Sequence, residues 1–194
     1  MDLSRELLKL LRRTVGGELS RRRRRRGSAP LIIAVLVVVG FGIDRLLDRP
    51  QAPAPGRGAS LVCGVTSVYD GDTATLNCPD GELKVRVWGI DTPEIRQAPW
   101  GRQSRDALRA RMPGDVRVEV LDTDRYGRSV ARLYDGQQDL GLSLVRDGQA
   151  AVYRQYNDSA LYRQAEDQAR RDRKGIWSEP GAQQTPWEWR KLNP

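Results

Sequence analysis

The sequence predicts an α+β domain that follows a basic and apolar N-terminal segment. The chain has 194 residues, of which 39% are hydrophobic, so it has room for one ordinary core plus appendages. Five short β-rich stretches come first in the domain, and helical patterns follow late in the chain instead of alternating with the strands. This order indicates a small sheet or barrel with separate helices, and it argues against a doubly wound fold.

The N-terminal part has the features of a targeting segment. Residues 1–28 form a basic tail that includes the run Arg21–Arg26, and residues 29–47 contain an apolar stretch. Arginines on one flank favour holding that flank in the cytoplasm, so we expect the rest of the chain to lie outside a bacterial-type inner membrane. The apolar run Ala29–Ile43 would span only about 22 Å as a helix, less than the roughly 30 Å core of a bilayer. Two alternatives stay open, a short transmembrane anchor and a signal segment whose cleavage would release a secreted protein.

Three further regions follow the apolar segment. Residues 48–60 are rich in Pro, Ala and Gly, which predicts an extended linker. The folded domain is expected over residues 61–180. Residues 181–194 form an aromatic and basic extension, and we expect its tryptophans to pack back onto the domain rather than to meet a ligand.

The strands and helices of the domain can be assigned in chain order. β-branched and aromatic residues between turn residues predict five strands, Leu61–Tyr69, Thr73–Cys78, Glu82–Ile90, Val116–Asp122 and Ser129–Asp135. Apolar residues at helical spacing predict three helices, Trp100–Met112, Leu140–Asp147 and Asp158–Lys174. The last helix has a capping residue at Asn157 or Asp158 and stops at Gly175.

Two cysteines lie symmetrically about the predicted tip of the first hairpin, at Asp70 and Gly71. Cys63 and Cys78 would then face each other on adjacent strands. A cross-strand disulfide is geometrically reasonable at such positions in an oxidising compartment. Two buried free thiols are the alternative.

Composition and charge exclude several kinds of chemistry. The chain contains no histidine, which excludes a histidine-based catalytic triad, a histidine metal site and a phosphohistidine intermediate. Nearly all of the net charge of +8 comes from the N-terminal tail, because residues 60–194 carry twenty basic and twenty acidic side chains. Overall charge therefore does not indicate nucleic-acid binding by the domain, and specific residues must carry that argument.

Three short motifs combine carboxylates with arginines. They are Asp70–Thr73, then Asp91–Glu94 after the strand that carries Arg86, and then Asp124–Arg128. Each alone has a structural explanation, a hairpin turn for Asp-Gly or a surface salt bridge for an arginine. Together they suit phosphate chemistry, because carboxylates hold hard cations and guanidinium groups bind phosphodiesters through two parallel hydrogen bonds.

A role can be assigned to each of these side chains. Calcium takes oxygen ligands, and the candidates here are Asp72, Asp91 and the main-chain carbonyl of Thr92. Glu94 is near enough in sequence to activate a water molecule as a general base. The groups expected to bind phosphate and to stabilise its developing charge are Arg86 and Arg128.

On these motifs the chain resembles the staphylococcal nuclease (thermonuclease) family, from about Leu61 to Glu179. The resemblance implies an oligonucleotide-binding (OB-fold) barrel of five strands with three helices. It also implies a calcium-dependent phosphodiesterase that cleaves DNA and RNA and leaves 3′-phosphates. It assigns the same roles to the residues named above and adds nucleotide-packing tyrosines at Tyr126, Tyr153 and Tyr156. The segment 95–101 is shorter than the family's mobile loop, which bears on substrate preference and calcium affinity.

The sequence thus favours a calcium-dependent phosphodiester hydrolase that degrades DNA and RNA outside the cytoplasm, either tethered to the membrane by its apolar segment or secreted. We expect the catalytic domain to be monomeric. The alternative is a non-catalytic module of the same fold that binds nucleic acid or an envelope partner without cutting it.

Overall fold

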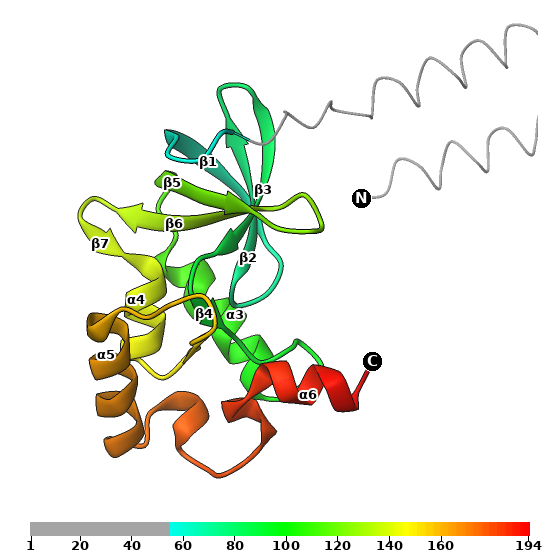
Figure 1. The fold of residues 1–194 in the computed structure, drawn as a ribbon, viewed down its shortest axis with the longest axis vertical. Helices are drawn as coiled ribbons and strands as arrows, with labels where there is room; N and C mark the ends of the chain where they lie inside the picture. The colour runs from blue at the N-terminus through cyan, green and yellow to red at the C-terminus, as the bar shows by residue number, and fades with distance from the viewer. Residues whose placement is uncertain (1–54) are drawn as a thin grey trace, which may run out of the picture. The chain divides into compact units, whose positions relative to one another are not determined.

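Residues 55–194 are described by a computed structural model (Figure 1). The predicted basic tail, the apolar segment and most of the linker lie outside the described residues. Within residues 55–194, no helix combines the length and the apolar composition that crossing a membrane requires.

Five strands form a closed barrel, as the sequence predicts. They are β1 (Ser60–Val68), β2 (Thr73–Cys78), β3 (Gly81–Val87), β5 (Asp115–Thr123) and β6 (Ser129–Asp135). Antiparallel pairings join them in the order β3-β2-β1-β5-β6, and a short β7 (Gln138–Asp139) continues the edge of β6. A parallel pairing between β3 and β6 closes the ring, with Val85 opposite Ser129 and Val87 opposite Ala131.

Side chains that alternate along each strand fill the barrel interior. In β5, Val116, Val118 and Val120 are fully buried, while the residues between them are partly exposed. Ala74 and Leu76 of β2 follow the same pattern. Successive side chains of a strand point to opposite faces, so a two-residue apolar period places one whole set in the core. The β-rich stretches therefore form strands because their apolar residues share one face.

Four α-helices of the described part lie at one end of the barrel (Figure 1). Three match the predicted helices: α3 (Trp100–Arg111), α4 (Leu140–Arg146) and α5 (Ala160–Arg171). The Asp139 carboxylate caps α4 by accepting a hydrogen bond from the Leu142 amide at 3.1 Å. The fourth helix, α6 (Pro186–Leu192), was not predicted and lies in the C-terminal extension. Two 3₁₀ turns precede it, η1 (Gly175–Trp177) and η2 (Ala182–Gln184).

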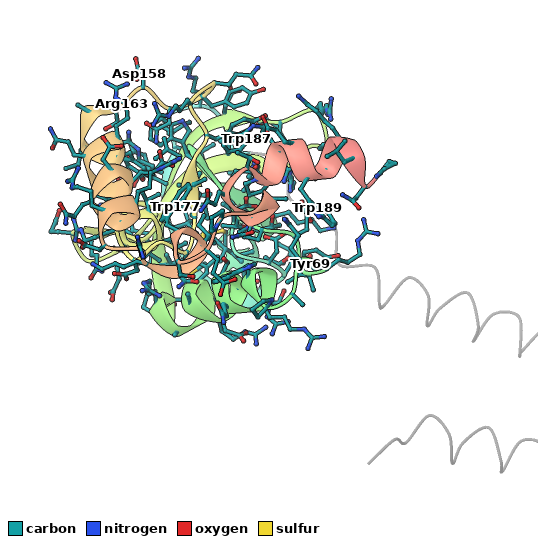
Figure 2. All side chains as sticks on the ribbon, turned by 90° about the horizontal axis from the view of Figure 1, so that it is seen from below. Tyr69, Asp158, Arg163, Trp177, Trp187 and Trp189 are labelled. Atoms are coloured by element: carbon teal, nitrogen blue, oxygen red, sulfur yellow. A yellow bond between two sulfur atoms is a disulfide. The ribbon has the colours of Figure 1, made fainter. Side chains whose placement is uncertain are left out.

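The C-terminal extension packs back onto the domain, as expected from its tryptophans. The Trp187 ring stacks on Tyr153, with 5.8 Å between ring centroids and 7° between ring planes. Trp189 lies on another side of α6, where the Arg96 guanidinium is 5.5 Å from its ring centroid (Figure 2). These contacts place α6 next to the loop that follows β4 (Ile90–Asp91).

The stretch 82–90 is not one strand, which corrects the prediction. β3 ends earlier, and the chain turns at Gly89, whose φ is 72°. A Cβ at this position would lie 2.5 Å from Nδ2 of Asn157, so both the dihedral angle and the available space require glycine. The next two residues form β4, which pairs with β8 (Ala151–Val152) in a separate two-stranded sheet. The turn therefore carries the chain off the barrel just before the second acidic motif.

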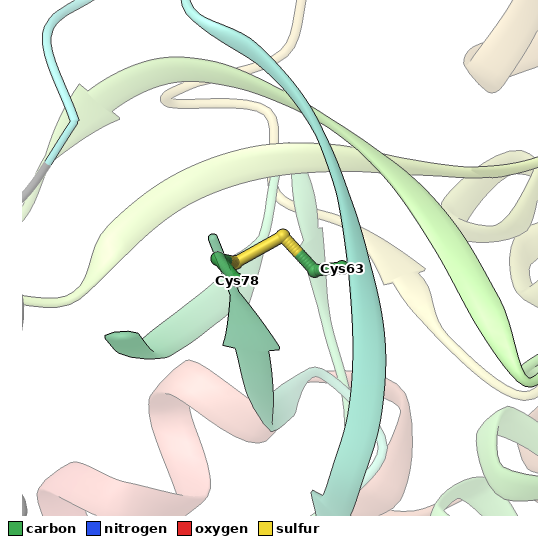
Figure 3. The surroundings of a disulfide bond; sticks show 2 residues. All are labelled: Cys63 and Cys78. Atoms are coloured by element: carbon green, nitrogen blue, oxygen red, sulfur yellow. A yellow bond between two sulfur atoms is a disulfide. The ribbon is translucent and has the colours of Figure 1, made fainter. Parts of the chain in front are cut away.

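Cys63 of β1 and Cys78 of β2 form a disulfide (Figure 3). Their Cα atoms are 4.4 Å apart, because the two residues continue the register in which Gly64 faces Asn77. Both cysteines are buried. The bridge fastens the first hairpin at the end opposite to its turn, which carries the first acidic motif.

Candidate active site

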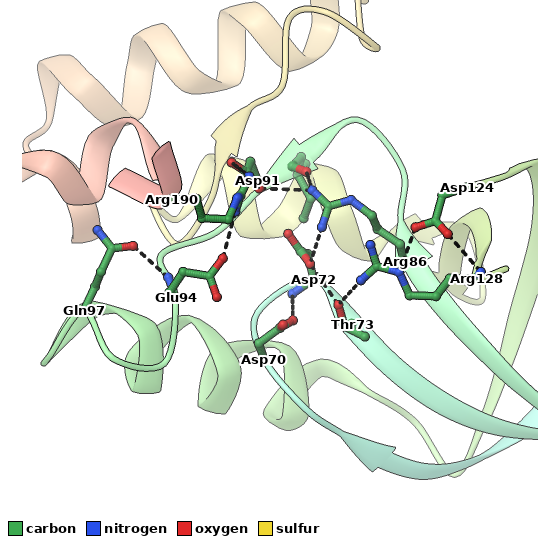
Figure 4. Close-up of polar contacts among 11 residues, drawn as sticks. Asp70, Asp72, Thr73, Arg86, Asp91, Glu94, Gln97, Asp124, Arg128 and Arg190 are labelled. Atoms are coloured by element: carbon green, nitrogen blue, oxygen red, sulfur yellow. Dashed lines mark hydrogen bonds and ion pairs between the residues drawn. The ribbon is translucent and has the colours of Figure 1, made fainter. Parts of the chain in front are cut away.

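One large pocket contains side chains from all three motifs. It has a volume of about 1430 Å³ and is lined by barrel residues, by the segment after β4 and by α6. The predicted catalytic residues on its wall are Arg86, Glu94 and Arg128, and Asp70, Asp72 and Thr92 also line it. Folding therefore brings to one place residues that are far apart along the chain (Figure 4).

The first motif places two carboxylates at the turn between β1 and β2. The Asp70 carboxylate accepts a hydrogen bond from the amide of Asp72 at 3.0 Å. Gly71 between them packs closely, since a Cβ there would lie 2.7 Å from Cβ of Ser104. Burial, together with the charge of Asp72, raises the pKa of Asp70 to about 7. Negative charge is crowded at this turn, and a positive partner would relieve the repulsion.

Arg86 connects the first two acidic motifs. Its backbone lies opposite Thr73 in the β2–β3 register. Its Nη1 donates to Oδ1 of Asp72 at 2.9 Å, and its Nη2 donates to Oδ1 of Asp91 at 3.0 Å. Burial alone would lower the pKa of Arg86, but the charges of Asp72 and Asp91 outweigh burial and raise it. The Arg86 guanidinium therefore stays charged and binds one oxygen of each of the two carboxylates.

Asp91 is the more deeply buried of the two predicted cation ligands. Its side chain is 0% exposed, whereas that of Asp72 is 4% exposed. Burial and the charge of Asp72 raise the pKa of Asp91, while hydrogen bonds and charge from Arg190 and Arg86 oppose the rise. A carboxylate at such a depth requires cationic partners, because an isolated buried charge is costly.

Arg128 reaches the same pocket from the loop between β5 and β6. Its Nε donates to Oδ2 of Asp124 at 2.8 Å, and its Nη1 donates to Oγ1 of Thr73 at 3.3 Å. The Thr73 hydroxyl donates in turn to Oδ1 of Asp72 at 3.1 Å. The two arginines are therefore linked through one threonine and one carboxylate, and Arg128 points into the acidic site rather than away from it (Figure 4).

Glu94 lies in the loop after β4, at the rim of the pocket. Its amide donates to Oε1 of Gln97 at 2.8 Å, which fixes the backbone. Gly101 of α3 packs against the same loop, since a Cβ there would overlap with the Glu94 carbonyl oxygen. The side chain is 33% exposed, so it can meet both the pocket and solvent water.

The predicted nucleotide-packing tyrosines line the same pocket. Tyr126 is 69% exposed and lies beside Arg128, whose guanidinium is 5.7 Å from the ring centroid. Tyr153 and Tyr156 are in edge contact, with ring centroids 5.0 Å apart. One face of Tyr153 is already covered by Trp187, so the aromatic surface includes the C-terminal extension.

Arg190 of α6 belongs to this site, and the sequence analysis did not identify it. Its Nη2 donates to Oδ1 and Oδ2 of Asp91, at 3.0 and 2.8 Å, and its Nη1 donates to Oε1 of Glu94 at 2.9 Å. The available signal was a short aromatic and basic run that starts with Pro186, a residue suited to the first turn of a helix. Nothing in that run indicates contact with an acid 99 residues upstream.

The oxygen atoms of Asp72 and Asp91 suit a hard cation. Within residues 55–194, no three acidic or cysteine side chains form a cluster that could hold a metal ion by themselves. The predicted set has only two carboxylates, so the Thr92 carbonyl and water would have to complete it, as is common for calcium. Both carboxylates lie within hydrogen-bond distance of the Arg86 guanidinium, which brings hard oxygen donors together, and Asp91 is also bound by Arg190. The residues present therefore fit such an ion.

Comparison with known proteins identifies the family. The model of the family described as "Staphylococcal nuclease homologue" matches residues 84–179. The chain is 34% identical over 141 residues to "Micrococcal nuclease" of Shigella flexneri, which covers 66% of this chain and 80% of the relative. It is 35% identical over 129 residues to "Uncharacterized endonuclease" of Escherichia coli O157:H7, which covers 65% of this chain and 82% of the relative.

A protein of Haemophilus influenzae, also named "Uncharacterized endonuclease", is 34% identical over 131 residues, or 66% of this chain and 72% of the relative. The closed five-stranded barrel agrees with these matches, and the predicted enzyme class, a phosphodiester hydrolase, is confirmed by them. The chain belongs to the family of staphylococcal nuclease homologues.

Proposed function

We propose that this chain is a calcium-dependent nuclease that hydrolyses DNA and RNA outside the cytoplasm and leaves 3′-phosphate ends. The observation that carries the proposal is a single pocket in which two guanidinium groups, the buried Asp72 and the partly exposed Glu94 converge. Asp91 does not line this pocket, but it lies directly behind its wall and accepts a hydrogen bond from Arg86. This set matches the needs of phosphodiester cleavage without histidine.

In the proposed site, Asp72, Asp91 and the Thr92 carbonyl hold the cation. A bound divalent ion would polarise a phosphate oxygen and make water a better nucleophile. The protein's own contribution is to keep hard oxygen donors together at depth, which the hydrogen bonds of Arg86 to both carboxylates support.

Glu94 is proposed to accept the proton from the water that attacks phosphorus. Its position on a loop fixed by Gln97 and Gly101 supports a defined geometry for this transfer. The water attacks phosphorus in line with the bond to the 5′ oxygen; that bond breaks, the 5′ oxygen takes a proton from solvent to become a hydroxyl, and the phosphate stays on the 3′ side.

Arg86 and Arg128 are proposed to bind the phosphate oxygens and to stabilise the negative charge that grows in the transition state. Their side chains are 18% and 26% exposed, so each can turn toward a ligand in the pocket while keeping part of its protein contacts. Bases next to the cleaved bond would stack on Tyr126, Tyr153 and Tyr156.

The location outside the cytoplasm is proposed from the N-terminal sequence and from the disulfide. Basic residues precede the apolar run 29–43, which favours a cytoplasmic N-terminus and an exported domain. Cys63 and Cys78 are bonded, and structural disulfides persist in oxidising compartments. We propose membrane anchoring, with secretion after cleavage as the other outcome, and a monomeric catalytic domain.

The test uses the purified full chain in mild detergent, with plasmid DNA and RNA as substrates. Cleavage is expected with Ca²⁺, loss of cleavage with a chelator, and 3′-phosphates on the products. Glu94→Gln should lower the rate about 100-fold or more, the usual contribution of a general base. Lys84→Ala, an exposed residue on β3, is the matched control and should cut normally.

Full activity of Arg86→Ala would contradict the assignment of that arginine. Binding of single-stranded DNA without any cleavage in Ca²⁺ would instead support the non-catalytic alternative. Fractionation of cells with an antibody against the C-terminus would test the location.

A further inference from the structure

The C-terminal helix α6 places a guanidinium on the two acids that the proposed mechanism needs most. Arg190 donates to both oxygens of Asp91 and to one oxygen of Glu94, all within 3.0 Å (Figure 4). Oδ1 of Asp91 also accepts a hydrogen bond from Arg86. Every carboxylate oxygen of Asp91 is therefore bound by an arginine, and the group is 0% exposed.

A divalent cation would need the same oxygens. Three of the roughly four lone-pair positions of the Asp91 carboxylate already accept hydrogen bonds from arginines, so an ion bound there would have to lie directly beside the Arg190 guanidinium or displace it. Like charges at this separation also repel strongly in a partly buried site. Binding of the ion and binding of Arg190 to Asp91 are thus mutually unfavourable.

The helix that carries Arg190 is held by few buried contacts. α6 has seven residues, and Pro186 is its single buried residue. Trp187 is partly buried: it stacks on Tyr153 and packs against the small apolar cluster of Ala151, Ala169, Ile176 and Trp177. Arg96 contacts the Trp189 ring and the carbonyl of Asn193, just after the helix. Because no residue of α6 belongs to the barrel core and most of its residues are partly or fully exposed, α6 can shift without unfolding the barrel.

We propose that Arg190 is an internal counter-ion that competes with the catalytic cation for Asp91 and Glu94, and thereby sets the cation concentration that the enzyme requires. This inference rests on the proposed function, because it assumes that the cation binds at Asp91. When Arg190 is bound, Glu94 is also engaged and cannot accept a proton from water. Cation binding releases the guanidinium, frees Glu94 and loosens α6.

The competition has a quantitative consequence. A ligand that binds only to the open form has an apparent Kd raised by the reciprocal of the open fraction. If Arg190 is engaged in about nine molecules of ten, its removal should lower the Kd for Ca²⁺ about tenfold, or ~1.4 kcal/mol. Removal of another positive charge from α6 should change the Kd for Ca²⁺ much less, because that charge does not occupy the carboxylate oxygens.

The test is calorimetric titration of the full chain with CaCl₂, without nucleic acid. Arg190→Gln should bind Ca²⁺ about tenfold more tightly than the wild type. Lys191→Gln is the matched control, because it also removes one positive charge from α6. Within residues 55–194, Lys191 contacts no carboxylate, so the Kd of this variant for Ca²⁺ should stay near that of the wild type. Arg190→Lys keeps the charge but loses the two-pronged geometry and should lie between wild type and Arg190→Gln.

Hydrogen exchange of the peptide 185–194 provides a readout that does not depend on affinity. In the wild type, Ca²⁺ should increase its deuterium uptake, because α6 is released. In Arg190→Gln, uptake should be high already and should change little with Ca²⁺. Circular dichroism and Tm check that each variant is folded.

Equal Ca²⁺ affinity of wild type and Arg190→Gln, weaker affinity of the variant, or unchanged exchange of α6 would each overturn the inference. The proposed function fails differently: a chain with the expected Arg190 dependence of Ca²⁺ binding that cuts neither DNA nor RNA would refute the nuclease mechanism. A chain that cuts normally, with a Kd indifferent to Arg190, would refute only the competition.

Discussion

Replacement of Asp124 by asparagine tests how the structure holds the second phosphate-binding arginine. Oδ1 of Asp124 accepts hydrogen bonds from the amides of Tyr126 and Arg128, at 2.9 and 3.0 Å. Oδ2 accepts a hydrogen bond from Nε of Arg128 at 2.8 Å. Asparagine keeps an oxygen for the two amides but turns an NH₂ group toward Nε, so the loop remains and the ion pair is lost.

The size of the effect follows from this single lost contact. A hydrogen bond to a charged group contributes roughly 1.5–3 kcal/mol. The Asp124 and Arg128 side chains are 16% and 26% exposed, so we expect a value near the lower end, about 1.5 kcal/mol of unfolding free energy. If the misplaced guanidinium loses the same amount in the transition state, kcat/KM falls about tenfold.

The assay measures kcat/KM on a short single-stranded DNA at saturating Ca²⁺, together with the Tm of each protein. Asp135→Asn serves as the control, because Asp135 is an exposed acid at the far end of β6 that does not line the pocket. Asp124→Asn with a lowered Tm but wild-type kcat/KM would refute the reasoning, since Arg128 would then act without the support of Asp124 or not act at all.

The pH dependence of stability reports on the same contact. Burial alone would raise the pKa of Asp124, but the Arg128 amide, the Arg128 guanidinium and the Tyr126 amide outweigh burial and lower it. A lowered pKa in the folded state contributes stability above the unfolded-state value, near 3.9, and this contribution is lost as the pH falls through the folded-state pKa. The Tm advantage of wild type over Asp124→Asn should therefore be present at pH 7 and shrink below about pH 4. A constant difference down to pH 3 would contradict this.

Two further predictions concern the scaffold. The double variant Cys63→Ser and Cys78→Ser removes a disulfide between residues 15 apart in the sequence. It should lose about 3 kcal/mol of unfolding free energy and roughly 10 °C in Tm, measured by circular dichroism. The reduced wild type is the control and should lose as much. Gly89→Ala places a Cβ at a residue with a φ of 72° and against Asn157, so it should lower the unfolding free energy by about 2 kcal/mol or more. It should also lower the affinity for Ca²⁺, because β4 follows directly. A melting curve equal to that of the wild type would show that the turn adapts to the side chain.

Much of the barrel could be predicted from local patterns. The limits of β2 and β6 agree with the predicted stretches, because their apolar residues alternate and turn residues flank them. The break after β3 could not be predicted in this way. Apolar residues continue through Ile90, and the decisive contact at Gly89 comes from Asn157, a distant residue expected to cap a helix. The N-cap of α5 is Ser159, so the predicted cap at Asn157 or Asp158 is wrong. Asn157 instead accepts a hydrogen bond from the Ser159 amide at 2.9 Å and donates one to the Gly89 carbonyl at 3.2 Å.

The candidate site shows a similar division. Residue types and strand ends were enough to select Asp72, Arg86 and Glu94, because their chemistry is specific as a set. Arg190 was not found, because an arginine in a short C-terminal run has many possible surface partners and only tertiary structure selects Asp91. The roles of the individual side chains, calcium as the cation and the location of the enzyme stay predictions that the experiments above address.

The parallel pairing of β3 and β6 makes catalysis a sensitive indicator of barrel integrity. It consists of three residue pairs, fewer than any antiparallel pairing of the barrel. Arg86 lies in the middle of this pairing, and Arg128 immediately precedes it. Partial separation of these two strands would move the guanidinium groups apart while every helix stays folded. On gentle warming or in dilute urea, the rate of hydrolysis should therefore fall before the helical circular dichroism signal does. Activity would be lost through opening of the shortest strand pairing in the barrel.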